Sequence, residues 1–120
     1  MKQSTVSKVK IQQWKTGAIR DSKEGKGRFD LTSPLVDRLL AQHFQKGGAR
    51  HGDRNWEKGI PFSSFYDSAR RHLASEHEGM KDEDHLVSAL WNIYCWIHTR
   101  EMIKRGKLPK FLDDLPKYST

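Results

Sequence analysis

Apolar side chains recur at helical spacing in three separate stretches of this 120-residue chain. The first stretch follows Ser33 and Pro34, a pair typical of a helix start, because serine caps free backbone amides and proline fits the first helical position. Its recurring positions are Leu35, Leu39, Leu40, His43 and Phe44. The consecutive glycines Gly47 and Gly48 are predicted to end this helix.

Two further helices are predicted downstream. The second starts at a serine cap, Ser63 or Ser64, and ends near Gly79. It presents Phe65, Ala69, His72 and Leu73. The third and longest helix runs from a cap at Asp82 to Gly106. Its apolar stripe consists of Leu86, Leu90, Ile93 and Ile97.

Two polar loops that contain glycine, residues 17–31 and 52–61, flank the first helix. Since no segment shows the alternation of a convincing strand, the sequence predicts an all-α domain with three main helices and two ordered polar loops. A short helical turn is predicted around Phe111 and Leu112. The predicted layout is an N-terminal tail or arm over residues 1–15, a helical domain over 16–106 and a C-terminal tail over 107–120.

The formal net charge of +7 arises entirely in the first half of the chain. Residues 1–60 hold 13 Lys and Arg against 6 Asp and Glu, whereas residues 61–120 hold 9 of each. This asymmetry predicts an anionic partner, which could be a nucleotide, a nucleic acid or an acidic protein surface.

Cysteine usage and hydropathy narrow the class of protein. Cys95 is the only cysteine, which excludes an intramolecular disulfide and a metal cage made of cysteines. No apolar run approaches the roughly 20 residues that span a bilayer, and the N-terminus lacks the apolar core of a signal peptide. The sequence therefore predicts no membrane partner and a location in the cytoplasm, which is the host-cell cytoplasm if the chain is viral.

The loop over residues 17–31 has the composition of a phosphate-binding segment. Its glycines permit close backbone approach, and its Lys and Arg side chains can donate hydrogen bonds to phosphate oxygens. The candidate phosphate-binding residues are Arg20, Lys23, Lys26 and Arg28. Gly25-Lys26 is followed by Gly27 rather than by Ser or Thr, which excludes a P-loop NTPase.

The second loop, residues 52–61, offers Asn55, Trp56 and Lys58 as further binding residues. Trp56 has two interpretations. It either stacks on a base, or it packs as a hydrophobic plug that pins the loop to the core.

Polar side chains on the second and third helices form the candidate catalytic set. They are Asp67, His72, Glu83, Asp84, His85 and Asn92. Each has a structural alternative, because acids near a helix start can cap it and isolated histidines often form hydrogen bonds within a core. Asn92 interrupts an apolar run, and burying its amide costs about 1–3 kcal/mol without hydrogen bonds, so it requires a partner or a ligand.

Four motifs, taken in chain order, resemble a known family. They are TGAIRDSKEGKGRFDL, GDRNWEKG, DSARRHL, and DEDHL followed by WN at Trp91 and Asn92. This order resembles the phage-associated family of dATP/dGTP diphosphohydrolase N-terminal domains, over residues 16–99. The resemblance implies Mg²⁺-dependent hydrolysis of purine deoxynucleoside triphosphates to the monophosphate and pyrophosphate. It also implies an activity related to that of MazG-like all-α NTP pyrophosphatases, and a helical domain over 16–106 that binds the nucleotide.

The resemblance also suggests a role for each candidate residue. Asp67 and Asp84 would hold Mg²⁺, and Glu83 would act as a third carboxylate or a water-activating base. Water or substrate would be oriented by His72, His85 and Asn92. The triphosphate would be neutralised by Arg20, Lys23, Lys26 and Arg28. Trp56 or Asn55 would contact the base, and Lys58 would be a further substrate-binding residue.

The chain also departs from the MazG-like pattern. The Glu-Glu-x-x-Glu cluster and the Glu-x-x-Asp pair, which supply metal ligands there, are absent. Two alternatives follow: a non-catalytic module that sequesters a nucleotide or cyclic nucleotide and, ranked last, a nucleic-acid-binding accessory protein. A homo-oligomer is expected, because three helices leave apolar surface that a second copy can cover.

Overall fold

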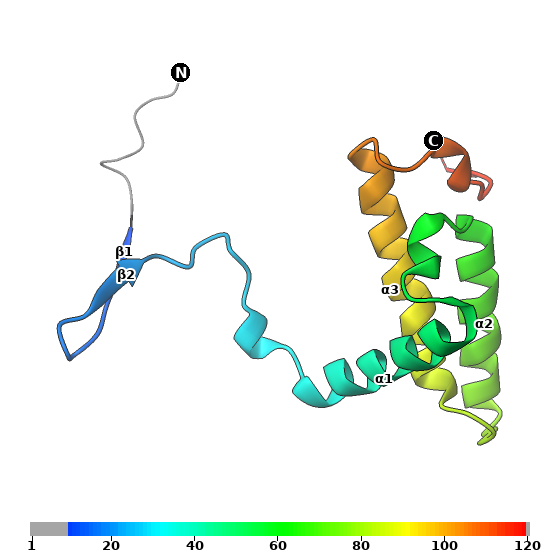
Figure 1. Ribbon diagram of the computed structural model, residues 1–120, viewed down its shortest axis with the longest axis horizontal. Coiled ribbons are helices and arrows are strands. Elements are labelled where there is room, and N and C mark those ends of the chain that lie inside the picture. Colours follow the sequence, from blue (N-terminus) through cyan, green and yellow to red (C-terminus); the bar gives the residue numbers. More distant parts are fainter. Residues whose placement is uncertain (1–9, 120) are drawn as a thin grey trace. The chain divides into compact units, whose positions relative to one another are not determined.

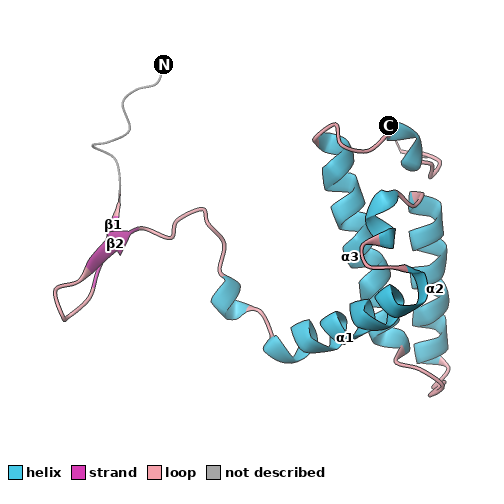
Figure 2. Cartoon of the chain, viewed as in Figure 1, coloured by secondary structure: helices cyan, strands magenta, loops and turns pink. Residues whose placement is uncertain are grey.

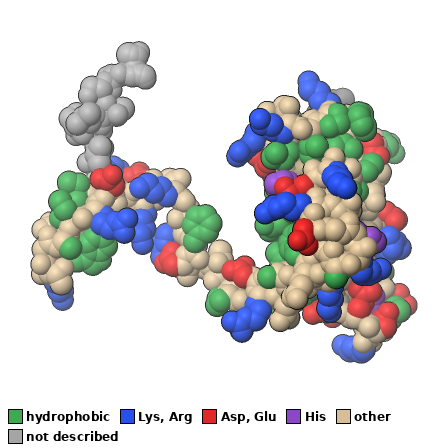
Figure 3. Space-filling view, in the orientation of Figure 1, with side chains coloured by type: hydrophobic (Ala, Val, Ile, Leu, Met, Phe, Trp, Pro, Cys, Tyr) green, Lys and Arg blue, Asp and Glu red, His purple; other side chains and the backbone are tan. Residues whose placement is uncertain are grey.

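The computed structural model describes residues 10–119 and divides the chain into two compact units, residues 1–33 and 34–120 (Figure 1). Most of the N-terminal tail predicted over residues 1–15 lies outside the described residues. Among the described residues, no helix is both long enough and apolar enough to cross a membrane. Basic side chains are spread over the visible face of both units, interspersed with acidic ones (Figure 3).

The first unit contains a two-stranded antiparallel hairpin, β1 (Ile11–Gln13) and β2 (Ile19–Asp21), shown in magenta in Figure 2. Gln12 lies opposite Arg20, and Gly17 occupies the connecting turn with a φ of 94°. A 3₁₀ turn follows at Phe29–Leu31. The sequence predicts a tail or arm and then a loop here, and its expectation that the segment contains no strand is wrong. Three-residue strands with nearly every residue exposed have no alternation that a sequence pattern could reveal.

The second unit is helical, which confirms the predicted fold class. It contains α1 (Pro34–His51), α2 (Phe62–His77) and α3 (His85–Lys104), with 3₁₀ turns at Asn55–Lys58 and Lys110–Leu112. The last of these turns lies where the sequence predicts a short helical turn. Figure 1 shows α2 and α3 side by side along their length, and α1 packs against α3.

Small and polar side chains, rather than large apolar ones, form the buried face of α3. The buried residues are His85, Ser88, Ala89, Asn92, Cys95 and Thr99. The Asn92 amide donates to the Ser88 carbonyl at 2.9 Å, and the Thr99 hydroxyl donates to the Cys95 carbonyl at 2.8 Å. These polar groups are therefore satisfied within the helix, and the partner that the sequence requires for Asn92 is a backbone oxygen.

The predicted apolar stripe of α3 lies mainly on the surface. Leu86 is 55% exposed, Ile93 39% and Ile97 46%, while Leu90 is half-buried. Apolar spacing alone predicts this stripe. The residues of α3 that are buried against the rest of the unit lie on another side of the helix. One face of the longest helix therefore stays apolar and solvent-exposed within a single chain.

Both predicted helix caps are wrong. Asp84, not Asp82, caps α3, and its carboxylate accepts a hydrogen bond from the Val87 amide at 3.1 Å. At the start of α2, the Ser63 amide and hydroxyl donate to Asp114 at 2.9 and 2.6 Å. Asp114 lies in the C-terminal tail, so a long-range contact satisfies a first-turn amide of α2, and the N-cap position is Pro61 rather than a serine.

Gly47 and Gly48 lie inside α1 instead of ending it. A Cβ atom on Gly48 would lie 2.5 Å from the Asp53 carboxylate, whereas one on Gly47 would meet nothing within 4 Å. Gly48 thus permits the chain after α1 to fold back closely against the helix, which is a packing role rather than a stop signal.

We expect alanine at these adjacent glycines to have different effects. Gly47→Ala should raise the free energy of unfolding by about 0.5–1 kcal/mol, because alanine loses less backbone entropy in a helix. Gly48→Ala should raise it less, because the Asp53 carboxylate must rotate away from the new methyl group. Urea denaturation of both variants measures the difference, and equal stabilisation by the two would contradict the close approach.

We also expect the Asp114 contact to make stability depend on pH. Its two hydrogen bonds from Ser63 hold the pKa of the Asp114 carboxyl below its usual range. The stabilisation is therefore present above the unfolded-state pKa and is lost as pH falls through the folded-state pKa. Asp114→Asn should lower the melting temperature at pH 7 and change it little at pH 2. The control is Asp113→Asn, which removes only an exposed pair with Lys117.

Candidate functional site

A cleft of about 990 Å³ lies in the second unit. Its walls come from the last turns of α1, the loop over residues 52–60 and the start of α3. Cationic side chains from the first two segments line it: Lys46, Arg50 and Arg54. Carboxylates from the chain just before α3, Glu83 and Asp84, line it as well. The cleft therefore presents both the charges that attract phosphates and the oxygens that bind cations or water.

Trp56 lines this cleft and also packs against aromatic rings. Its ring centroid lies 5.4 Å from that of Phe44, 6.3 Å from Tyr94 and 4.8 Å from His98. The second and third of these contacts are edge-to-face, a favourable arrangement for aromatic pairs. Trp56 therefore pins its loop to α1 and α3, as the plug interpretation predicts, and it also forms part of the cleft wall. Its stacking on a base stays a prediction.

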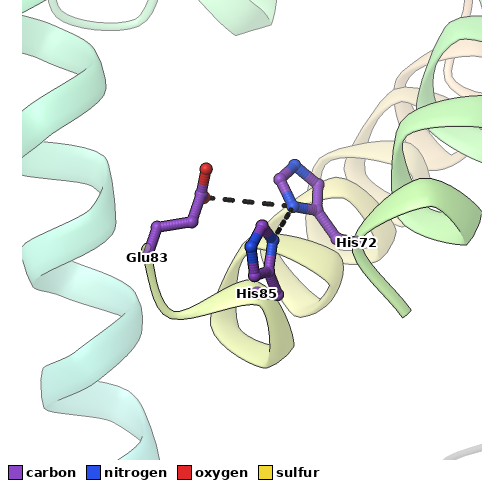
Figure 4. A group of neighbouring side chains, drawn as sticks. All are labelled: His72, Glu83 and His85. Carbon is purple, nitrogen blue, oxygen red and sulfur yellow. Dashed lines mark hydrogen bonds and ion pairs between the residues drawn. The ribbon is translucent and has the colours of Figure 1, made fainter. Parts of the chain in front are cut away.

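Three of the predicted catalytic residues come together next to the cleft (Figure 4). His72 belongs to α2, Glu83 precedes α3, and His85 is the first residue of α3. The two Nδ1 atoms of His72 and His85 are 2.9 Å apart, and His72 Nδ1 lies 3.9 Å from Glu83 Oε1. One potential ligand atom from each residue lies within 4.8 Å of the other two.

Two further side chains orient this His–His–Glu cluster. Asp82 Oδ1 lies 2.7 Å from His85 Nε2, and the Ser88 hydroxyl donates to Glu83 Oε1 at 2.8 Å. The hydrogen bond to His85 lowers the pKa of the Asp82 carboxyl, so at neutral pH Asp82 only accepts. His85 Nε2 must therefore carry the proton in this contact, which leaves the lone pair of a neutral His85 ring on Nδ1, facing His72.

His43, from α1, is a further titratable side chain of the cleft wall. Its ring lies 5.4 Å from that of Trp91. Burial lowers the pKa of His43, and nearby Glu83 opposes this shift. From the sequence, His43 is identified only as a position in the helical spacing. The signal that could have identified it is that His43 is the one titratable side chain among those five spaced positions.

Trp91, in the cleft wall, carries a buried polar atom without a hydrogen-bond partner among the described residues. This atom is its indole Nε1. A buried donor without a partner costs about 1–3 kcal/mol.

The other predicted site residues occupy different places. Asp67 is exposed on α2 and pairs with Arg71 at 3.2 Å, and it is not among the cleft-lining residues. Lys58 is exposed outside the cleft lining, and Asn92 is buried within α3. Residues that do line the cleft are Asn55, Trp56, Glu83 and Asp84. The four predicted phosphate-binding residues lie in the first unit: Arg20, Lys23, Lys26 and Arg28. Arg28 pairs with Asp30.

The model of one protein family, described as dATP/dGTP diphosphohydrolase, N-terminal, matches residues 16–108. The chain belongs to this family, as the four sequence motifs predict. Among curated proteins and among solved structures, nothing matches it.

Proposed function

Starting from this family membership, we propose that the chain binds a purine deoxynucleoside triphosphate in the cleft and hydrolyses it to the monophosphate and pyrophosphate. The observation that supports the proposal most strongly is the composition of one cleft. The same cavity is lined by an aromatic ring for a base, basic side chains for a triphosphate and carboxylates for its counter-ion.

The basic side chains and Trp56 account for binding. Lys46 and Arg50 would neutralise phosphate oxygens, and the amide of Asn55 can exchange hydrogen bonds with a base edge. A base stacked on an aromatic ring gains about 1–3 kcal/mol. Because Trp56 is already held by its aromatic neighbours, little side-chain entropy would be lost when a base stacks on it.

Glu83 is the best candidate for a general base. Its side chain is about half exposed, it lines the cleft, and Ser88 fixes one of its oxygens. A carboxylate held in this way can accept a proton from water as the water attacks the α-phosphorus, with pyrophosphate as the leaving group. Mg²⁺ that arrives with the triphosphate would neutralise phosphate charge, and it needs only one or two protein carboxylates, a role that Asp84 can serve from the cleft wall.

An assay of the four deoxynucleoside triphosphates with Mg²⁺ tests this proposal. We expect release of pyrophosphate from dATP and dGTP, and a decrease of about 10²–10⁴-fold in kcat for Glu83→Gln, the range of general-base catalysis. The matched control is Glu78→Gln, at the exposed end of α2. Absence of pyrophosphate with all four nucleotides would contradict the proposal, and so would equal rates for the two variants.

The non-catalytic alternative has one observation in its favour. The group of potential metal ligands found among residues 10–119 contains a single carboxylate, Glu83, rather than the several that MazG-like sites use. A binding module would hold dATP or dGTP in calorimetry without metal and would release it unchanged. Recovery of intact nucleotide after saturation therefore distinguishes sequestration from hydrolysis.

We also propose that the exposed stripe of α3 pairs with the same stripe of a second copy. Residues 86–97 contain no charged side chain, although 31% of the chain is charged. An uncharged apolar face complements itself better than it complements a charged partner, and a twofold axis would match the stripe to its own copy.

Light scattering after size-exclusion chromatography tests this pairing. Ile97→Asp should shift the mass from that of a dimer to that of a monomer, because it places a charge in the stripe. The control is Leu35→Asp, in the first turn of α1, where the side chain is 73% exposed, and it should leave the mass unchanged. A monomeric wild-type chain would contradict the pairing.

A further inference from the structure

We propose that His72, His85 and Glu83 bind a first-row divalent transition-metal ion of the class of Zn²⁺, Co²⁺ and Mn²⁺. This inference does not depend on nucleotide binding, because the ion can bind whether or not the cleft accepts a nucleotide. It assigns Glu83 to the ion instead of the general-base role proposed above. It also differs from the Mg²⁺ site predicted at Asp67 and Asp84, both in its residues and in the chemistry of its ligands.

The first argument is the convergence of the ligand atoms. Ligands bound to one Zn²⁺ ion at about 2.0–2.2 Å lie roughly 3–4 Å from each other. The two Nδ1 atoms are 2.9 Å apart, Glu83 Oε1 is 3.9 Å from His72 Nδ1, and no pair exceeds 4.8 Å. Small rotations of side chains would therefore bring all three atoms to a shared ion. Within residues 10–119, the ligand atoms of three His, Cys, Asp or Glu side chains come this close together in this group.

The second argument is the direction of the lone pairs. The Asp82 contact requires the proton of His85 on Nε2, so Nδ1 presents a lone pair toward His72. A simple hydrogen bond between the two rings requires one proton between their Nδ1 atoms and does not require a carboxylate beside them. Here the Glu83 carboxylate faces the same pair of nitrogens, as Figure 4 shows. Two nitrogens and a carboxylate oxygen together form a donor set for a cation.

The third argument is the outer layer of hydrogen bonds. Histidines that bind metal usually donate their second ring N–H to a carboxylate or carbonyl, which fixes the tautomer and makes the ligand more basic. Asp82 has this position on His85, and Ser88 orients Glu83. His85 and Ser88 are 4% and 3% exposed, so the ring and the hydroxyl that positions Glu83 are held by packing.

The donor types indicate the class of metal. Mg²⁺ prefers oxygen ligands in octahedral geometry, whereas imidazole nitrogen suits Zn²⁺, Co²⁺ and Mn²⁺. Two histidines and one glutamate are also the donor set of hydrolytic zinc sites, where the remaining position holds water or substrate. Glu83 and Ser88 line the cleft, so an ion held by the cluster would border the cavity.

Metal binding to the full chain, without nucleotide, tests the inference. We expect one Zn²⁺ per chain by elemental analysis after dialysis. We also expect visible absorption typical of four- or five-coordinate Co²⁺ when Co²⁺ replaces Zn²⁺. Glu83→Gln and His72→Gln should abolish both signals. Asp82→Asn should weaken Zn²⁺ affinity about 10–100-fold, as loss of an outer-layer partner does elsewhere.

Matched controls and folding checks keep the test decisive. His77→Gln and Glu78→Gln change exposed residues near the end of α2 and should bind Zn²⁺ like the wild type. Glu83 is about half exposed, so its variant should keep the circular dichroism spectrum of the folded chain, even if replacement of the buried His85 does not.

Two results would overturn the inference. One is that the wild-type chain binds neither Zn²⁺ nor Co²⁺ when the metal is present at the same concentration as the protein. The other is binding that survives in Glu83→Gln and His72→Gln. In either case the cluster would be a hydrogen-bonded chain from Asp82 through His85 to His72 that joins α2 to α3. Because no nucleotide enters this experiment, failure of metal binding and failure of pyrophosphate release are separate outcomes.

Discussion

The close packing of α2 against α3 is the constraint on which the candidate site depends. Near the start of α3 the buried side chains are small or polar, whereas Trp96 further along packs against Phe62 and Tyr66 of α2. Asn92 and Thr99 donate to carbonyls of their own helix, and Ser88 donates to Glu83. Small residues allow two helix axes to approach closely, while satisfied polar groups avoid the cost of burial. This approach brings His72 of one helix within hydrogen-bond distance of His85 at the start of the other. A core of larger side chains would hold the two rings apart.

The opposite requirement, an accessible cavity, is met by aromatic packing on another side of α3. Phe44 of α1 and Tyr94 of α3 surround Trp56, so the loop over residues 52–60 is fixed at one end of the cleft by ring contacts. Gly48 lets the same loop begin close to α1. The loop wall of the cleft is therefore held against the two helical walls mainly by side-chain contacts.

The sequence was sufficient to predict what depends on local pattern. Apolar spacing gave the three helices, with α1 starting at Pro34, and the candidate set included all three members of the His–His–Glu cluster. Features that depend on distant contacts were not predicted. Asp114 caps a helix 51 residues earlier, and the exposed stripe of α3 follows from where α1 and α2 pack. Asp84 caps α3 in place of Asp82, and Asp82 accepts from His85, because either aspartate has a spacing that suits a cap.

The C-terminal segment extends the folded unit beyond the region that defines the family. The family match ends at residue 108, yet Leu112 is 4% exposed and its side chain packs near Gly59, where a Cβ atom would lie 3.0 Å from Leu112 Cδ1. Burial of a leucine contributes about 1.5–3 kcal/mol. A fragment cut at residue 108 would lose this leucine together with Asp114, and would expose both the start of α2 and the end of the cleft loop. The boundary of the sequence family and the boundary of the cooperative folding unit are therefore different positions in this chain.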